Sequence, residues 1–215
     1  MVRVLLFTLI ALGIVSTPAK VGIANAAADY LRPVMKSVGG SARIDYAGVC
    51  SGQNKLLFPT VDAQPASQGA TGITAVRQIF RNDPQATTIV QDKSGMVRIT
   101  IGNVSTSGLR TRIPVLTFDS ASQYNPLSAA DAITIALGTY AARHGLQFGM
   151  ASFVIDHLVG PPVEGAPHLP PRMQNVTVDD ALGSLARTFK GIVLYGSCRQ
   201  PDGKELFRID YIRGS

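Results

Sequence analysis

The stretch 175–198, NVTVDDALGSLARTFKGIVLYGSC, contains the signals of one helix and of the strand that follows it. Thr177 is a preferred helix-capping residue, and Asp179 and Asp180 place negative charge where the dipole of a helix favours it. The apolar residues recur at helical spacing and are Leu182, Leu185, Ala186 and Phe189. Lys190-Gly191 ends the helix, and IVLY follows at once. The stretch therefore predicts a capped amphipathic helix packed against a strand.

The residues after this helix predict a β-hairpin. The strands 192–195 and 206–212 flank Pro201-Asp202-Gly203, which is a strong turn sequence. An earlier segment has the same order, a helix over 72–83 followed by a hairpin over 87–102. The two helix–hairpin units indicate an internal duplication, although such units are also common in unrelated proteins. We expect an α+β fold with small, mostly antiparallel sheets packed against amphipathic helices.

Two further elements follow from similar patterns. Residues 42–49, ARIDYAGV, alternate apolar residues with the polar Arg43 and Asp45, which is typical of a strand with one solvent-exposed face. Ser128-Ala-Ala-Asp131 is close to a capping box and predicts the start of a helix that ends at Gly145. The buried stripe that we expect on this helix consists of Ile133, Leu137, Tyr140 and Ala141. The tripeptide LQF after this glycine predicts a short strand.

Loops and shorter elements complete the expected order. A short helix runs from Asp29 to Val38. The stretch 51–71 is rich in Gly, Ser, Gln and Pro, and we expect a loop with a brief strand at LLF. Residues 109–118 have strand character, and Pro114 indicates an edge or a break. The proline-rich residues 160–172 predict a connector across the surface or between subdomains.

The N-terminus resembles a secretory signal peptide. It opens MVRVLLFTLIALGIV, with one positive charge at Arg3 and an apolar run shorter than the roughly 20 residues that cross a bilayer. Ala24-Asn25-Ala26 satisfies the cleavage rule, so we expect removal of residues 1–26, with an uncleaved membrane anchor as the alternative. The remainder divides into an N-terminal α+β region, 27–118, and a second α+β region, 119–215. We expect a periplasmic or secreted protein with no stable membrane span after cleavage.

The charge of the chain is mildly basic. The formal net charge is +6, and it falls to +4 when Arg3 and Lys20 are removed with the signal peptide. The lysines and arginines are scattered and form no run of three or more. Binding to nucleic acid depends on a concentrated basic patch, so we expect no nucleic-acid partner. Loose attraction to an anionic membrane surface stays open.

The sequence contains two cysteines, Cys50 and Cys198. Each follows a plausible strand, YAGVC and YGSC, and an oxidising compartment favours their pairing. We therefore expect a disulfide that joins the two regions. The alternative, a redox-active thiol, lacks the usual C-x-x-C partner.

Residues 115–213 combine two motifs in a fixed order. A helix that ends in G-L-x-F is followed by x-N-V-T-x-x-x-A-L-x-x-L, a second helix and a final hairpin. The residues that carry these motifs are Gly145, Leu146, Phe148, Asn175, Val176, Thr177, Ala181, Leu182, Leu185, Phe207 and Ile209. The segment resembles the short N-terminal domain shared by secretins and TonB-dependent transducing receptors, although its linker between the helices is longer. The resemblance implies a periplasmic protein-interaction module without catalytic residues.

Candidates for chemistry are few. His144 follows the predicted helix and is typical of a cation at a helix C-terminus. Asp156-His157 could pair as a general base, but adjacent side chains on a strand point to opposite faces, which favours surface residues. His157, Glu164 and His168 do not have the spacing of a known zinc motif, and no HExxH, G-x-S-x-G, P-loop or G-x-G-x-x-G sequence is present. We expect no catalytic residue, no metal site and no cofactor.

Two functional hypotheses follow. The first is a non-enzymatic adaptor or accessory protein of the bacterial envelope, which binds another envelope protein by strand addition to an exposed sheet edge. The second is a small-ligand binder or hydrolase with a site between the two regions, using Asp156, His157 or His168. An exposed edge strand with apolar neighbours would favour the first hypothesis, and a pocket with convergent polar groups would favour the second.

Overall fold

The computed structural model describes residues 24–213, apart from 52–54, 60, 146–147 and 151–164. The predicted signal peptide lies almost wholly outside these residues. Helices and strands are both abundant, and the predicted α+β fold is confirmed. None of the described helices has both the length and the apolar character needed to cross a membrane.

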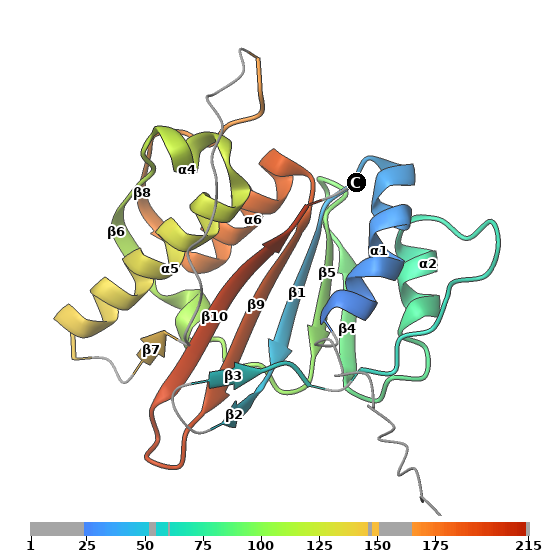
Figure 1. The fold of residues 1–215 in the computed structure, drawn as a ribbon, viewed down its shortest axis with the longest axis horizontal. Helices are drawn as coiled ribbons and strands as arrows, with labels where there is room; N and C mark the ends of the chain where they lie inside the picture. The colour runs from blue at the N-terminus through green and yellow to red at the C-terminus, as the bar shows by residue number, and fades with distance from the viewer. Residues whose placement is uncertain (1–23, 52–54, 60, 146–147, 151–164, 214–215) are drawn as a thin grey trace, which may run out of the picture.

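A six-stranded mixed sheet forms the centre of the molecule (Figure 1). Its strands in spatial order are β4 (Ala86–Gln91), β5 (Val97–Ile101), β1 (Ala42–Ala47), β9 (Ile192–Arg199), β10 (Glu205–Ile212) and β7 (Phe148–Met150). The two predicted hairpins, β4–β5 and β9–β10, are antiparallel. β1 pairs in parallel with both β5 and β9, which the sequence did not indicate. Pairing between strands that are far apart along the chain leaves no local sequence pattern.

Two small antiparallel sheets lie outside the main sheet. They pair β2 (Val49–Ser51) with β3 (Lys55–Leu57), and β6 (Arg112–Thr117) with β8 (Arg172–Thr177). The helices are α1 (Ala24–Val38), α2 (Gly72–Ile79), α3 (Ser107–Arg110), α4 (Ser120–Tyr124), α5 (Pro126–Arg143) and α6 (Val178–Phe189). Strand β8 was not expected, and its pairing with β6 supplies the partner for the predicted edge strand.

Helices cover both faces of the main sheet. α1 and α2 pack on one face, and α5 and α6 pack on the other (Figure 1). On β1, Ile44 and Tyr46 belong to the core beneath α1 and α2, while Arg43 and Asp45 point to the opposite face. The predicted solvent-exposed face of this strand is wrong, because Arg43 and Asp45 are each only 1% exposed. Alternation predicts the strand, but it does not reveal what covers the polar side.

The start and the end of α6 follow the sequence prediction. The Asp180 N–H donates to the Thr177 hydroxyl oxygen at 3.1 Å, and the Thr177 hydroxyl donates to the Asp180 carboxylate at 2.6 Å. Lys190 ends the helix in the left-handed conformation, with a φ of 50°. The first of these hydrogen bonds satisfies a backbone N–H that would otherwise be unpaired at the helix N-terminus, and the second holds the Thr177 side chain in place.

The start of α5 differs from the prediction. Asn125 caps this helix, and its side-chain oxygen accepts a hydrogen bond from the Leu127 N–H at 2.9 Å. The predicted capping box at Ser128 is therefore wrong. Asn125 is a preferred capping residue, and Pro126 fits the first helical position because it has no N–H to satisfy.

Both predicted regions contribute strands to the main sheet. β1 comes from the first region and lies between β5 of that region and β9 of the second. Both predicted helix–hairpin units are formed, by α2 with β4–β5 and by α6 with β9–β10. Their helices lie on opposite faces of the sheet, so each unit completes one of the two cores.

Candidate functional site

A hollow on the described surface runs between β6 and α5, and we call it the β6–α5 groove. Its volume is about 640 Å³. Its lining consists of Ile113, Pro114, Val115, Leu116 and Thr117 of β6, Asp119 and Ser122 of the α4 turn, and Ala132, Ile135, Ala136, Thr139, Tyr140, Arg143 and His144 of α5 and its C-cap. Consecutive β6 residues line the groove, although the side chains of a strand alternate between its faces. The groove therefore runs along the edge of β6.

Helix α5 has two apolar stripes. The first is buried against the sheet and consists of Ala129, Ala130, Ile133, Leu137 and Ala141. The second lines the groove and consists of Ala132, Ile135, Ala136 and Tyr140. Ile135 is 47% exposed, and Val115 across the groove is 43% exposed. A helix of a free-standing domain usually keeps its second face polar, so this stripe marks a surface that another molecule can cover.

The edge strand β6 pairs with only one strand, β8, within the described residues. The register places Pro114 opposite Asn175, between the pairs Ile113–Val176 and Val115–Gln174. The Asn175 carbonyl accepts a hydrogen bond from the Arg112 guanidinium at 2.6 Å, where Pro114 has no N–H to offer. The prediction that Pro114 lies on an edge strand is confirmed.

A group of charged residues, the arginine–aspartate cluster, lies between the sheet and the start of α6. Its members Arg43 and Asp45 are buried, and the side chains of Arg98 and Asp179 are 33% and 40% exposed. Asp45 accepts from Nε of Arg43 and from Nε of Arg98, both at 2.7 Å. The Asp179 carboxylate lies 2.9 Å from both guanidinium groups. The sequence pattern predicts only a helix-dipole role for Asp179, and the structure adds this ionic role. The cluster ties β1, β5 and α6 together.

The two carboxylates of this cluster affect the pKa of Arg98. Burial by itself would lower the pKa of the Arg98 guanidinium, but the negative charges of Asp45 and Asp179 outweigh that effect and raise the pKa. An arginine that is held in its charged form cannot exchange a proton at neutral pH. Arg98 therefore contributes a permanent positive charge that helps to hold β5 against β1 and α6.

The tetrapeptide RIDY is present twice in the sequence. It occurs at 43–46 on β1 and again at 208–211 on β10. In the second copy Arg208 donates from Nε to Asp210 at 2.6 Å, but both side chains are about one-third exposed. The same four residues thus form a buried ion pair on a central strand and a partly solvated ion pair on β10.

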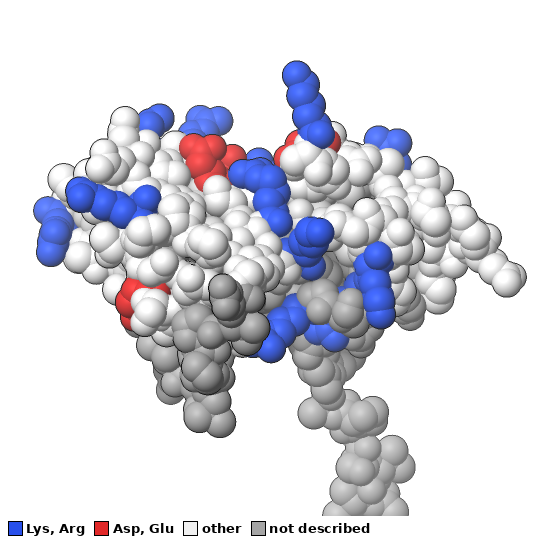
Figure 2. All heavy atoms as spheres, turned by 90° about the horizontal axis from the view of Figure 1, so that it is seen from above, with Lys and Arg blue, Asp and Glu red and all other residues white. Residues whose placement is uncertain are grey.

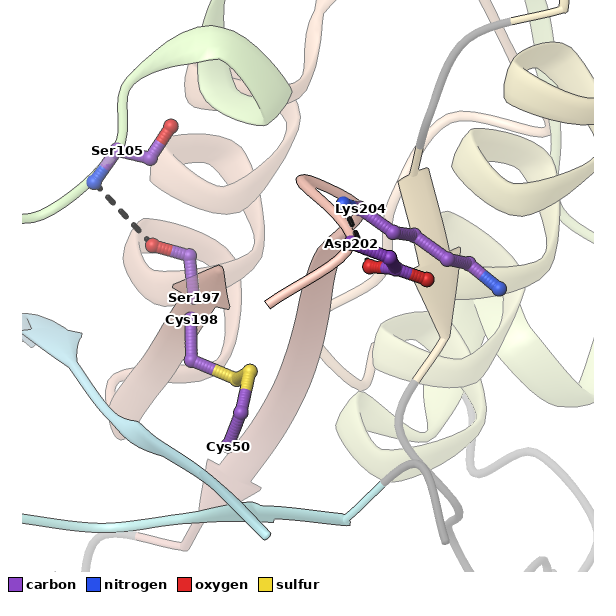
Figure 3. The surroundings of a disulfide bond; sticks show 6 residues. All are labelled: Cys50, Ser105, Ser197, Cys198, Asp202 and Lys204. Atoms are coloured by element: carbon purple, nitrogen blue, oxygen red, sulfur yellow. Dashed lines mark hydrogen bonds between the residues drawn. A yellow bond between two sulfur atoms is a disulfide. The ribbon is translucent and has the colours of Figure 1, made fainter. Parts of the chain in front are cut away.

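The predicted disulfide is confirmed. Cys50 on β2 is bonded to Cys198 on β9, and their Cα atoms are 5.5 Å apart (Figure 3). The bond links segments separated by 148 residues and fixes the small β2–β3 sheet to the main sheet.

The histidines do not converge on one site within the described residues. His144 is the C-cap of α5, and its ring lies 4.2 Å from that of Tyr140. His168 is exposed and lies beside Tyr124. Asp156, His157 and Glu164 fall outside the described residues. The described part of the chain contains no group of three or more His, Cys, Asp or Glu residues placed to hold a metal ion.

Charged side chains are distributed over the surface in separate groups. On the face shown in Figure 2, lysines and arginines stand among uncharged atoms and do not merge into one continuous patch. This distribution accords with the scattering of these residues along the sequence.

No protein-family model, no curated protein and no solved structure matches this chain. The geometry of the described residues is therefore the basis of the functional proposals.

Proposed function

We propose that this protein is a non-enzymatic interaction module of the bacterial envelope, which binds an extended apolar segment of another envelope protein in the β6–α5 groove. The segment adds as a third strand to β6. The observation that carries the proposal is the partly exposed apolar stripe of α5, with Ile135 at its centre, beside an edge of β6 that pairs with no strand among the described residues.

The groove suits strand addition for two physical reasons. An edge strand offers backbone groups to a new strand, which provides affinity that is largely independent of sequence. Every second side chain of the added strand would then face α5, where Ala132 and Ala136 leave room between Ile135 and Tyr140. The small side chains of α5 leave space and its large side chains provide apolar contacts. We therefore expect the partner strand to carry an apolar side chain at every second position.

The resemblance to the short N-terminal domain of secretins and TonB-dependent transducing receptors also supports the proposal. The groove is formed by β6 and α5, which belong almost entirely to the segment 115–213 that carries the resemblance. The disulfide between Cys50 and Cys198 is compatible with an oxidising compartment such as the periplasm. An export signal at residues 1–26 remains part of the proposal.

The experiment places a photo-crosslinking amino acid at one exposed position at a time and identifies the captured segment by mass spectrometry. The positions are 115 and 135 in the groove and 90 on β4 as the control. Val90 and Ile135 are equally exposed, at 47%. We expect positions 115 and 135 to capture the same segment of one envelope protein and position 90 to capture none of it.

A synthetic peptide of the captured segment then tests the mode of binding. We expect the peptide to slow amide hydrogen exchange in β6, and V115R or I135R to abolish its binding while V90R preserves it. Unchanged binding by both groove variants would refute the groove as the binding site. Capture of the segment through position 90 alone would show that the interface lies at β4 and not in the groove.

A further inference from the structure

A second cavity lies where the parallel strands of the main sheet end, and we call it the strand-end cavity. Its volume is about 400 Å³, which is within the range of small-molecule sites. Its walls come from Ala47 and Gly48 at the end of β1, Asn103–Ser105 after β5, Ser197–Arg199 on β9, and Glu205 at the start of β10. The cavity shares no residue with the β6–α5 groove.

The topology explains why a cavity forms there. β1, β5 and β9 are parallel, so their carboxyl ends meet at one edge of the sheet. After β1 the chain crosses to the α1–α2 face, where Cys50 and Leu56 join that core. After β5 it crosses to the other face, where Leu109 of α3 joins the second core. Connections that leave adjacent parallel strands in opposite directions open a crevice, which is the usual ligand position in sheets of this kind.

Glu205 is a polar group held inside this cavity. It is only 4% exposed, and its Oε2 accepts hydrogen bonds from the hydroxyls of Ser105 and Ser107, both at 2.8 Å. Its Oε1 is also buried, and it has no hydrogen-bond partner among the described residues. A buried carboxylate oxygen without a donor is costly, and a fixed carboxylate of this kind is suited to accept a donor from a ligand.

The surrounding residues favour a particular class of donor. Glu205 forms no ion pair within the described residues, so a cationic partner would gain most from its free oxygen. The cavity offers this one carboxylate among hydroxyl and amide groups, whereas Ca²⁺ sites take six to eight oxygen ligands with several carboxylates. A primary ammonium group needs fewer ligands, because its three N–H donors can bind Glu205 and neighbouring hydroxyls.

Arg199 adds the opposite charge to the same cavity. It lies directly across from Glu205 in the β9–β10 register, and its side chain is exposed. A guanidinium group binds a carboxylate through two parallel hydrogen bonds. Ser197 precedes Arg199 by two residues on β9 and also lines the cavity, and its hydroxyl oxygen accepts from the Ser105 N–H at 3.2 Å (Figure 3). The cavity thus presents a negative group, neutral hydroxyls and a positive group within one small volume.

We propose that the strand-end cavity binds a small zwitterion of the α-amino acid class. The ammonium group donates to Oε1 of Glu205, and the carboxylate accepts from Arg199. Binding involves no covalent change. This site is independent of the proposed protein-binding function.

The test measures binding of each of the twenty standard L-amino acids to the full exported protein with its disulfide intact, by thermal shift and then by isothermal titration calorimetry. We expect at least one amino acid to bind and its N-acetyl derivative to bind at least about tenfold more weakly, since one charged hydrogen bond is worth more than 1.4 kcal/mol. E205Q should weaken the binding of the unmodified amino acid to a similar degree. D202N should not, because Asp202 is an exposed residue of the β9–β10 turn that does not line the cavity, and its carboxylate accepts from the Lys204 N–H.

R199Q provides a second variant that does not disturb a buried group. In the unaltered protein the amino acid should bind more tightly than its carboxamide, and in R199Q the two should bind equally. If E205Q does not fold, the carboxamide comparison in R199Q tests whether the ligand carboxylate contacts Arg199. The N-acetyl comparison in the unaltered protein tests whether the ligand ammonium group contacts Glu205. The proposal is overturned if no amino acid binds at about 10 mM, a concentration above a millimolar Kd. Equal binding of the N-acetyl derivative also overturns it, as does a response to Ca²⁺ without any response to amino acids.

Discussion

Arg43 and Asp45 lie two positions apart on the central strand, and Nε of Arg43 is 2.7 Å from Oδ1 of Asp45 with both side chains buried. Removing the carboxylate leaves the Arg43 charge inside the protein with Asp179 as its remaining partner. Loss of one member of a buried pair costs about 3–5 kcal/mol. We expect D45N to lower the free energy of unfolding by about 3 kcal/mol in urea denaturation.

The second RIDY sequence provides the control for this prediction. D210N removes the same carboxylate from the same tetrapeptide, but the Arg208–Asp210 pair is partly solvated. We expect its loss to cost at most about 1 kcal/mol. Equal destabilisation by D45N and D210N would show that burial does not set the strength of these pairs.

The disulfide is expected to account for a large part of the stability. It closes a segment of 148 residues, and the chain-entropy model assigns such a loop about 5 kcal/mol. We expect the C50S/C198S double variant to lose about 3–5 kcal/mol of unfolding free energy, since measured values fall at or below the model. Reduction of the unaltered protein should give the same loss. A change below about 1 kcal/mol would mean that packing alone fixes the β2–β3 sheet.

Buried tyrosines predict a loss of stability at high pH. Burial, with a smaller effect from Asp210, raises the pKa of Tyr46, and burial, with a smaller effect from Glu205, raises the pKa of Tyr195. Burial also raises the pKa of Tyr211 to about 12. In the unfolded chain these phenols ionise near pH 10, so above about pH 10 the unfolded state loses protons that the folded state keeps. Their contribution is complete below about pH 10 and declines as the pH rises beyond it.

The measurement is urea denaturation between about pH 9 and pH 11, together with the phenolate absorbance of the folded protein. We expect stability to fall by about 1.4 kcal/mol per pH unit for each of Tyr46 and Tyr195 once the pH exceeds about 10. Three of the six tyrosines should stay protonated in the folded state at that pH. Ionisation of all six near the ordinary value, without unfolding, would contradict the prediction.

Two substitutions distinguish the observed cap of α5 from the one that the sequence predicts. N125A removes the side-chain oxygen that accepts from the Leu127 N–H, and loss of such a cap costs about 1 kcal/mol. S128A should change stability by no more than about 0.5 kcal/mol, because Ser128 is already inside the helix. Thermal unfolding of the two variants in parallel provides the comparison. A larger effect of S128A would place the functional cap at the predicted position.

The candidate site was only partly predictable. Pro114 indicated an edge or a break, and it lies on an edge strand of the described residues. The helix pattern correctly placed Ile133, Leu137 and Ala141 in the buried stripe. It wrongly included Tyr140, which is only partly buried and lines the groove. The second apolar stripe, with Ile135 and Tyr140, becomes visible only when β6 is placed beside it. The strand-end cavity left no signal that sequence reasoning could use, because Glu205 and Ser105 are 100 residues apart. The repeated RIDY sequence was a signal that could have been found, although its meaning differs between the two strands.

Elements with local causes could be predicted from the amino-acid sequence. The Thr177 cap, the end of α6 at Lys190 and the two hairpins follow from residues that contact their near neighbours along the chain. The position of β1 between β5 and β9, and hence the burial of Arg43 and Asp45, required the three-dimensional fold. Parallel pairing joins distant segments, and the burial of a polar face depends on which helices cover it. Neither property is encoded in the spacing of neighbouring residues.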